Sequence, residues 1–278
     1  MMVKKLLAFG ALMIFFSCND NTTPDYDPAL PVPPSNNLPP PQPITFTIEA
    51  VYPHDSQAFT QGLQYYNGKL YEGTGEPKQS TLRVVDIKTG KPEKQYLIPD
   101  PDIFGEGITI FKNKIYQLTW RNHKIFVYNL DDITHPINTL TWNMQGWGAT
   151  HDINNIIISD GSSKLYFVQP DESKKDMKIN KVLTVRNNLG EVDSLNELEL
   201  INGYVYANRW LTNDIVKIDT SNGYVVGKMD LTGLLQQYDP GAKTSSDAVL
   251  NGIAYDSTTK KLYITGKYWP KMFEMQLQ

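Results

Sequence analysis

The stretch from Phe104 to Trp120, FGEGITIFKNKIYQLTW, has the plan of a β-hairpin with a carboxylate at its entrance. Glu106 stands between two glycines, an apolar run follows, Asn113-Lys114 marks a turn, and a second β-rich run ends at Trp120. Glycines on both sides permit unusual backbone angles and let the Glu106 side chain project into a cavity. A Gly-Glu-Gly tripeptide alone is usually an ordinary turn, so the remaining sequence must decide whether Glu106 belongs to a site.

The same plan recurs in five segments of the chain: FTQGLQYYNGKLYEGTG, FGEGITIFKNKIYQLTW, GWGATHDINNIIISDG, LNELELINGYVYANRW and LNGIAYDSTTKKLYITGK. Asn67-Gly68 and Asn202-Gly203 predict tight hairpin turns, because both central residues of such turns adopt positive φ. A third alternating run and a fourth strand follow each pair, as in Leu82–Ile87 and Glu93–Ile98. Repeated four-stranded units at this spacing are typical of a β-propeller.

The last unit lacks a fourth strand, because the chain ends at Gln278 soon after the run Met272–Met275. The segment Thr45–Val51 precedes the first unit and is the candidate for the missing strand. Closing a ring with strands from both chain ends leaves no exposed sheet edge. We therefore predict an all-β fold over residues 44–278, a five-bladed β-propeller with ring closure by an N-terminal strand.

Alignment of the repeats predicts which side chains meet at the mouth of the central channel. The entry positions of the first strands are equivalent and read Gln61, Glu106, Trp147, Asn196 and Asn251. The ends of the second strands face the same mouth and read Gly75, Trp120, Gly161, Trp210 and Lys267. An acid, a base and three tryptophans thus fall around a single cavity, which favours a functional role for Glu106.

Alternative interpretations remain for several of these positions. Three tryptophans at equivalent rim positions favour ligand contact over simple packing. We interpret Asn251 as structural, its amide satisfying loop backbone groups, while Lys267 has a solvated rim charge as its alternative. Glu197 and Glu199, beside Asn196, have calcium binding as an alternative role.

The composition excludes several other classes of site. The net charge of −4 gives no basic footprint, so no nucleic-acid partner is expected. A structural zinc site is not predicted, because the chain has one cysteine and its histidines share no spacing. The histidines are His54, His123, His135 and His151.

The N-terminus has the features of a targeting segment. Lys4 and Lys5 precede the apolar run Leu6–Phe16, which is too short for a comfortable membrane-spanning helix. Cys18 follows at the expected cleavage point, so residues 1–17 resemble a bacterial lipoprotein signal peptide and Cys18 is the predicted lipidation site. Plain secretion with an incidental Cys18 is the alternative, although the absence of a second cysteine favours lipidation over a disulfide.

Residues 18–43 are rich in proline and are predicted to form an extended tether, because proline lacks the amide donor that helices and sheets need. The tether would hold the folded domain off a membrane surface. We therefore expect an exported, lipid-anchored monomer of the cell envelope, facing the periplasm or the cell surface.

From about Val51 to Leu277 the sequence is similar to the plant-type glutaminyl-peptide cyclotransferases, the glutamine cyclotransferase family of plants and bacteria. Eight short motifs keep the family's order: FTQG at 59–62, FGEG at 104–107, GWG at 146–148, SDG at 159–161, LNELE at 195–199, NRW at 208–210, LNGIA at 250–254 and TGKYWP at 265–270.

This resemblance implies a five-bladed propeller that converts an N-terminal glutamine into pyroglutamate and releases ammonia, with no metal or cofactor. The substrates would be peptides or exported proteins that begin with glutamine. The family's proton shuttle corresponds to Glu106, whose pKa we expect to be raised by apolar walls. Substrate contacts are implied for Phe59, Gln61, Trp120, Trp147, Asn196, Trp210 and Lys267.

Two other functions remain as alternatives. One is a non-enzymatic surface propeller that binds peptide or glycan through its tryptophan-lined mouth. The other is a calcium-dependent, lactonase-like propeller, which would use Glu197 and Glu199 as metal ligands.

Overall fold

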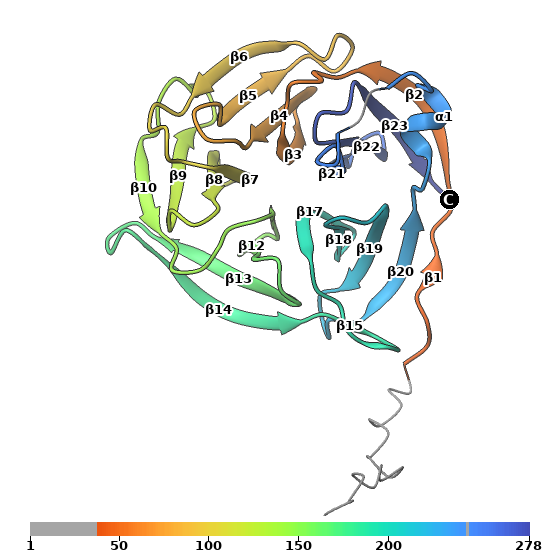
Figure 1. Ribbon diagram of the computed structural model, residues 1–278. Coiled ribbons are helices and arrows are strands. Elements are labelled where there is room, and N and C mark those ends of the chain that lie inside the picture. The colour runs from red at the N-terminus through yellow and green to blue at the C-terminus, as the bar shows by residue number, and fades with distance from the viewer. Residues whose placement is uncertain (1–37, 243–244) are drawn as a thin grey trace, which may run out of the picture. The chain divides into compact units, whose positions relative to one another are not determined.

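The computed structural model describes residues 38–242 and 245–278. The predicted signal peptide, Cys18 and the predicted tether up to residue 37 lie outside the described residues. The described residues form one compact unit, which consists largely of β-strands (Figure 1). The described residues contain no helix with the length and apolar character needed to span a bilayer.

Antiparallel strands fall into consecutive four-stranded groups, in the order that the repeats predict. The first group is β3 (Thr60–Tyr66), β4 (Lys69–Thr74), β5 (Thr81–Val85) and β6 (Pro92–Leu97). The second is β7 (Gly105–Phe111), β8 (Lys114–Thr119), β9 (Lys124–Asn129) and β10 (Asn138–Thr141). The third is β11 (Ala149–His151), β12 (Ile156–Ser159), β13 (Lys164–Asp171) and β14 (Asp176–Thr184), and a parallel pair of β10 with β14 joins it to the second.

The remaining groups complete the circle. The fourth is β17 (Leu195–Ile201), β18 (Tyr204–Arg209), β19 (Asp214–Asp219) and β20 (Val225–Asp230). The last is β21 (Leu250–Asp256), β22 (Lys261–Gly266) and β23 (Lys271–Leu277) with β2 (Phe46–Pro53). Short elements outside these groups are β1 (Gln42–Pro43), β15 (Arg186–Asn187), β16 (Gly190–Glu191) and the helix α1 (Leu234–Tyr238).

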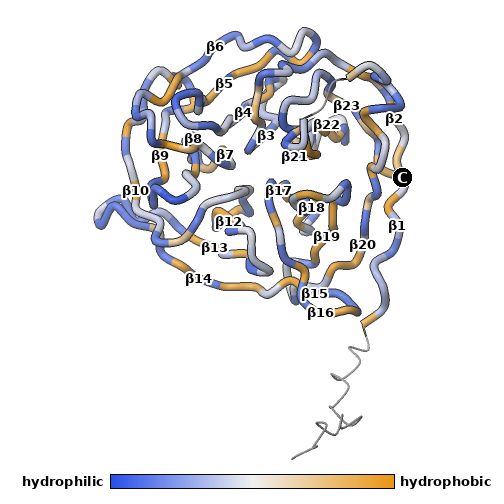
Figure 2. The backbone as a smooth tube through the Cα atoms, in the orientation of Figure 1, coloured by the Kyte–Doolittle hydropathy of each residue, from blue (hydrophilic) through white to orange (hydrophobic). Residues whose placement is uncertain are grey.

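The first strand of each group lies innermost, so these strands surround a common axis (Figure 1). β3 contacts β7 and β21, β11 contacts β7 and β17, and β17 contacts β21, which closes the inner ring. The β7 residues are all buried, whereas β6 at the periphery is mostly exposed. Hydrophobic stretches accordingly lie within the sheets, and the β13–β14 turn is hydrophilic (Figure 2).

The two ends of the described chain pair with each other, as the sequence predicts. β2 runs antiparallel to β23, with Phe46 opposite Leu277. The fourth strand of the last group therefore comes from the N-terminal side of the domain. β1 adds a short parallel pair to β20, so regular pairing begins at Gln42, two residues before the predicted boundary at residue 44.

The hairpin turns follow the chemistry of their central residues. Asn67-Gly68 has φ angles of 48° and 81°, and Asn202-Gly203 has 51° and 84°, as predicted for turns with two left-handed positions. In the second repeat the prediction was displaced by one residue. The turn is Lys112-Asn113, with φ of 50° and 61°, because Lys114 already begins β8.

Candidate active site

A cavity of about 300 Å³ lies where the inner strands begin. Its lining includes Glu106 and all seven predicted substrate-binding residues, which are Phe59, Gln61, Trp120, Trp147, Asn196, Trp210 and Lys267. Every four-stranded group contributes to this lining, the third through Trp147 in the loop before β11. The structure thus brings the predicted set together, while the individual roles stay predictions.

β-bulges direct side chains of the inner strands toward the cavity. The pairing register shifts between Gly105 and Ile108, so Glu106 lies within β7 but has no paired residue on β8. Equivalent shifts in β3, β17 and β21 surround Gln61, Asn196 and Asn251. A bulge inserts an unpaired residue and reorients its side chain, so the repeated irregularity explains why these positions form one ring.

The glycines beside Glu106 allow the inner strands to pack closely. A Cβ on Gly107 would lie 2.6 Å from the Trp147 carbonyl oxygen, and one on Gly105 would lie 2.8 Å from that of Thr74. Gly107 also donates its N–H to the Trp147 carbonyl at 2.8 Å. The glycines are therefore required by backbone contact, which fixes Glu106 between two neighbouring sheets.

Two members of the predicted second ring, Gly75 and Gly161, make room for aromatic rings instead of lining the cavity. A Cβ on Gly161 would come within 2.6 Å of the Trp147 indole, and one on Gly75 within 2.4 Å of the Phe104 ring. Gly161 also has φ of 82°, a conformation that glycine adopts without steric cost. These two glycines hence shape the aromatic walls.

The aromatic walls are packed edge to face. Trp147 and Trp210 have centroids 5.4 Å apart at 89°, and Phe104 contacts both Phe59 and Trp120 at 5.8 Å. Such edge contacts add to the stability that burial alone provides. The walls leave an apolar space around the few polar groups of the cavity, and this space is open to solvent, since Trp210 is 41% exposed.

Glu106 and Lys267 are the buried ionisable pair of this space. The Glu106 side chain is 4% exposed, and burial raises its pKa well above the ordinary value of 4.5, although the Lys267 ammonium opposes the shift. Burial lowers the pKa of Lys267 to about 8, although the negative charges of Glu106, Glu76 and Asp247 oppose this shift. The Lys267 Nζ also lies 4.5 Å from the centroid of the Phe59 ring. Both groups therefore titrate nearer to neutrality than they would in water.

The amides of the ring divide into two kinds. Asn196 lines the cavity, and its buried Oδ1 has no hydrogen-bond partner among the described residues. A buried acceptor without a partner is costly, so it is suited to a donor on a ligand. The Oδ1 of Asn251 also has no hydrogen-bond partner among the described residues, but Asn251 does not line the cavity. Its Nδ2 donates to the Thr60 carbonyl at 2.9 Å, which agrees with a structural role.

Glu197 and Glu199 of β17 accept hydrogen bonds from backbone N–H groups of other inner strands. Glu197 accepts hydrogen bonds from the N–H groups of Leu63 at 3.2 Å and Ile253 at 2.8 Å. Glu199 accepts the Tyr255 N–H at 3.1 Å, and burial raises its pKa to about 8. Oxygens that face N–H donors are poorly placed to bind a cation, and the described residues contain no group of three or more metal-ligating carboxylates, histidines and cysteines. This geometry does not favour the calcium alternative.

Three further residues line the cavity that the sequence did not single out: Phe104, Glu76 and Asp247. Phe104 belongs to the FGEG motif and was available to sequence reasoning. Glu76 follows β4 and has φ of 84°, which no sequence pattern announces. The loop that carries Asp247 has no counterpart in the repeats, so its position required the structure.

The protein is thus an all-β protein with a propeller-like ring of sheets. Its cavity contains a buried acid and a buried base, as the active site of an enzyme does. The family model for glutamine cyclotransferase matches residues 28–277 of the chain. The chain therefore belongs to the glutamine cyclotransferase family, and is an enzyme of the glutaminyl-peptide cyclotransferase type, which confirms the resemblance found in the sequence.

Individual relatives agree with this assignment. The chain is 38% identical over 233 residues to the glutaminyl-peptide cyclotransferase of Arabidopsis thaliana, across 83% of this chain and 71% of that protein. The crystal structure of Myxococcus xanthus glutaminyl cyclase is similar with a TM-score of 0.77 and 33% identity. That similarity covers 86% of this chain and 98% of the other.

Proposed function

We propose that this protein converts the N-terminal glutamine of peptides or exported proteins into pyroglutamate and releases ammonia. Family membership supports the reaction class, and one observation in the structure supports the mechanism. Glu106 is a buried carboxylate with a raised pKa, in a cavity that it shares with aromatic rings and Lys267. A carboxylate tuned toward neutrality is suited to general acid–base catalysis at physiological pH.

The proposed reaction needs one acid–base group. The neutral α-amine of the substrate attacks the γ-carboxamide carbon, and a new C–N bond closes a five-membered ring. Ionised Glu106 accepts the proton that the amine loses, and it returns this proton to the carboxamide nitrogen as the old C–N bond breaks. Ammonia leaves, the carboxylate is regenerated, and no other reactant is consumed.

The remaining cavity residues would position the substrate and stabilise charge. The Lys267 ammonium, which lines the same cavity, would stabilise the oxyanion that develops on the carboxamide oxygen. The unpartnered Oδ1 of Asn196 would accept an N–H of the substrate. Phe59, Trp120 and the other aromatic rings would hold the folded glutamine side chain and exclude water. Holding the side chain is the main requirement, because the reacting groups are already tethered and need mainly orientation.

We also propose the finer architecture that the sequence predicts, a five-bladed propeller in which β2 completes the last blade. The five consecutive antiparallel groups and the β2–β23 pair support this count.

For the N-terminal region we propose export, lipidation at Cys18 and a tether from Cys18 to the start of β1 at Gln42. Replacement of Cys18 by serine would then move the protein from the membrane to the soluble fraction. An unchanged distribution would contradict the lipid anchor.

The reaction itself is tested by mass spectrometry of a glutamine-initiated peptide incubated with the protein. We expect a loss of about 17 Da, the mass of the ammonia released in the acid–base reaction, and no loss from the matched peptide that begins with asparagine or N-acetylglutamine. Binding without turnover by the intact protein would instead favour the non-enzymatic binding propeller.

A further inference from the structure

A second groove, of about 360 Å³, adjoins the cavity and shares Glu76 with it. Its lining includes Gln95 of β6, the Asp55–Arg83 ion pair and Tyr268. The substrate of the proposed reaction remains attached to its polypeptide throughout. The cavity must therefore open onto a surface that accepts the residues after the glutamine, and this groove is such a surface.

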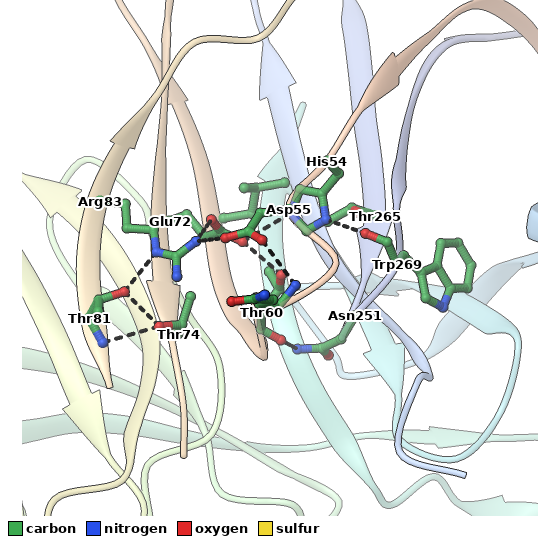
Figure 3. Close-up of polar contacts among 12 residues, drawn as sticks. His54, Asp55, Thr60, Glu72, Thr74, Thr81, Arg83, Asn251, Thr265 and Trp269 are labelled. Carbon is green, nitrogen blue, oxygen red and sulfur yellow. Dashed lines mark hydrogen bonds and ion pairs between the residues drawn. The ribbon is translucent and has the colours of Figure 1, made fainter. Parts of the chain in front are cut away.

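The floor of the groove is a preorganised polar network (Figure 3). Arg83 is 7% exposed, donates from Nη1 to Asp55 at 2.8 Å, and donates from Nε to Thr81 at 2.9 Å. Glu72 lies 3.7 Å from the same Nη1 and is itself paired with His54 at 3.1 Å. Because its polar groups already have partners, the floor offers a fixed surface to a bound chain.

The wall between cavity and groove consists of two residues with left-handed backbone. Glu76 has φ of 84° and Tyr268 has φ of 58°, which is uncommon for residues with side chains. Local hydrogen bonds hold both in place, since Ser80 Oγ donates to the Glu76 carbonyl at 2.8 Å and Tyr268 N–H donates to that of Ala58 at 2.7 Å. The Tyr268 ring packs edge-on to Phe59 at 5.2 Å, which links the wall to the cavity lining. Such conformations often persist where function requires a particular side-chain direction.

The charges at this wall favour a cation. Asp55 is neutralised by Arg83, whereas Glu76 forms no ion pair within 4.0 Å among the described residues. Glu76 and Asp247 both line the cavity. Burial, the charges of these two carboxylates and a hydrogen bond to Glu76 raise the pKa of Tyr268. The opposing cations are Lys267 inside the cavity and the exposed Lys78, which lines the groove together with Glu76. Glu76 and Asp247 therefore bring negative charge to the side of the cavity that adjoins the groove, and Glu76 is the carboxylate that the cavity and the groove share.

We propose that this groove binds the residues that follow the N-terminal glutamine and that Glu76 selects a basic residue directly after it. This inference rests on the proposed function, because it names the class of peptide that the same site accepts. Glu76 acts here as a specificity residue and takes no part in the chemical step.

The test compares kcat/KM for three synthetic substrates: Gln-Lys-Ala-Ala amide, Gln-Glu-Ala-Ala amide and the dipeptide Gln-Ala amide. We expect the intact protein to prefer the lysine peptide over the glutamate peptide by about threefold to tenfold, the range of one or two partly exposed charge pairs. The preference should shrink at high salt. Glu76→Gln should reduce the ratio toward one, and Glu76→Lys should invert it.

Two further variants make the result specific. Gln95→Trp fills the groove from a strand position that tolerates aromatic side chains, and it should lower the ratio of tetrapeptide to dipeptide kcat/KM. Glu49→Gln removes an equal charge from exposed β2 and should change no ratio.

The outcomes separate this inference from the proposed function. Turnover of the substrates without a lysine preference, or with a preference that survives Glu76→Gln, would overturn the groove proposal and leave the cyclase function standing. Failure to convert any glutamine peptide would overturn both.

Discussion

The indoles of Trp120 and Trp147 donate hydrogen bonds to one acceptor, the Oε1 of Gln145, at 2.8 and 3.0 Å. Trp120 directly follows β8 and Trp147 precedes β11, so a single side-chain oxygen fixes two walls of the cavity that come from different four-stranded groups. Gln145 does not line the cavity itself and would act only by positioning the two rings.

Removal of this acceptor should loosen both walls. We expect Gln145→Leu to raise KM by about tenfold with a smaller effect on kcat, because a lost buried hydrogen bond costs about 1–1.5 kcal/mol. Gln145→Glu keeps an acceptor and should restore most of the affinity. Steady-state kinetics with a glutamine dipeptide measures the split. An equal rise of KM in both variants would show that the hydrogen bonds to the shared acceptor do not determine substrate affinity.

Glu106→Gln should separate activity from stability. Removal of the proton shuttle should lower kcat by about 10²–10⁴-fold, the usual contribution of general acid–base catalysis. The folded-state pKa of Glu106 is raised, so its neutral form is favoured by folding, and that stabilisation is lost as pH rises through the folded value. Glutamine carries no such cost. The variant should therefore unfold at a higher temperature than the parent at pH 8, with the difference narrowing near pH 4.

The matched control is Glu49→Gln, which alters an exposed carboxylate on β2. It should leave both kcat and the melting temperature unchanged. Wild-type kcat in Glu106→Gln would remove this residue from the mechanism.

The sequence predicted the ring of strands and most of the cavity for a physical reason. Each repeat carries its own hairpin turn, such as Asn67-Gly68, and a turn fixes the register of the strands around it. Register in turn fixes which residue stands at the strand entrance, so alignment of the repeats was sufficient to place Gln61, Glu106 and Asn196 together.

Features outside the repeats could not be predicted in the same way. Glu76 reaches the cavity through a left-handed backbone conformation in a loop, and periodicity carries no information about such a loop. Alignment predicted Gly75 and Gly161 at the mouth, but neither lines the cavity, and only three-dimensional packing shows that they accommodate the rings of Phe104 and Trp147. Electrostatic balance also needed distances, since burial of Glu106 exceeds the opposing effect of Lys267.

The pH dependence of turnover should report the two buried groups. Glu106 must be ionised to accept a proton, so activity should rise with pH through a pKa well above 4.5. Lys267 must be protonated to stabilise an oxyanion, so activity should fall above its pKa of about 8. Deprotonation of the substrate amine increases its reactivity and cannot cause this fall. In Lys267→Arg, where the side chain stays charged, the alkaline decline should disappear from the kcat profile even if the maximum is lower; a decline that persists unchanged would assign it to another group.

Glu197 should prove to be a structural carboxyl group at the axis. Its two oxygens accept N–H donors from β3 and β21, whereas Glu199 accepts one backbone donor, from Tyr255. Glu197→Gln turns an NH₂ group toward one of these donors, which leaves a buried N–H without a partner and should cost about 1–3 kcal/mol in the free energy of unfolding. Glu199→Gln can keep its oxygen toward Tyr255 and should cost less.

Urea unfolding measures this difference as a shift of the midpoint at constant slope. Added calcium should not raise the midpoint of the parent protein, because the Glu197 oxygens already face N–H donors of the inner strands. Stabilisation by calcium that is abolished in Glu197→Gln would contradict this interpretation and would restore the metal-binding alternative for this pair of carboxylates.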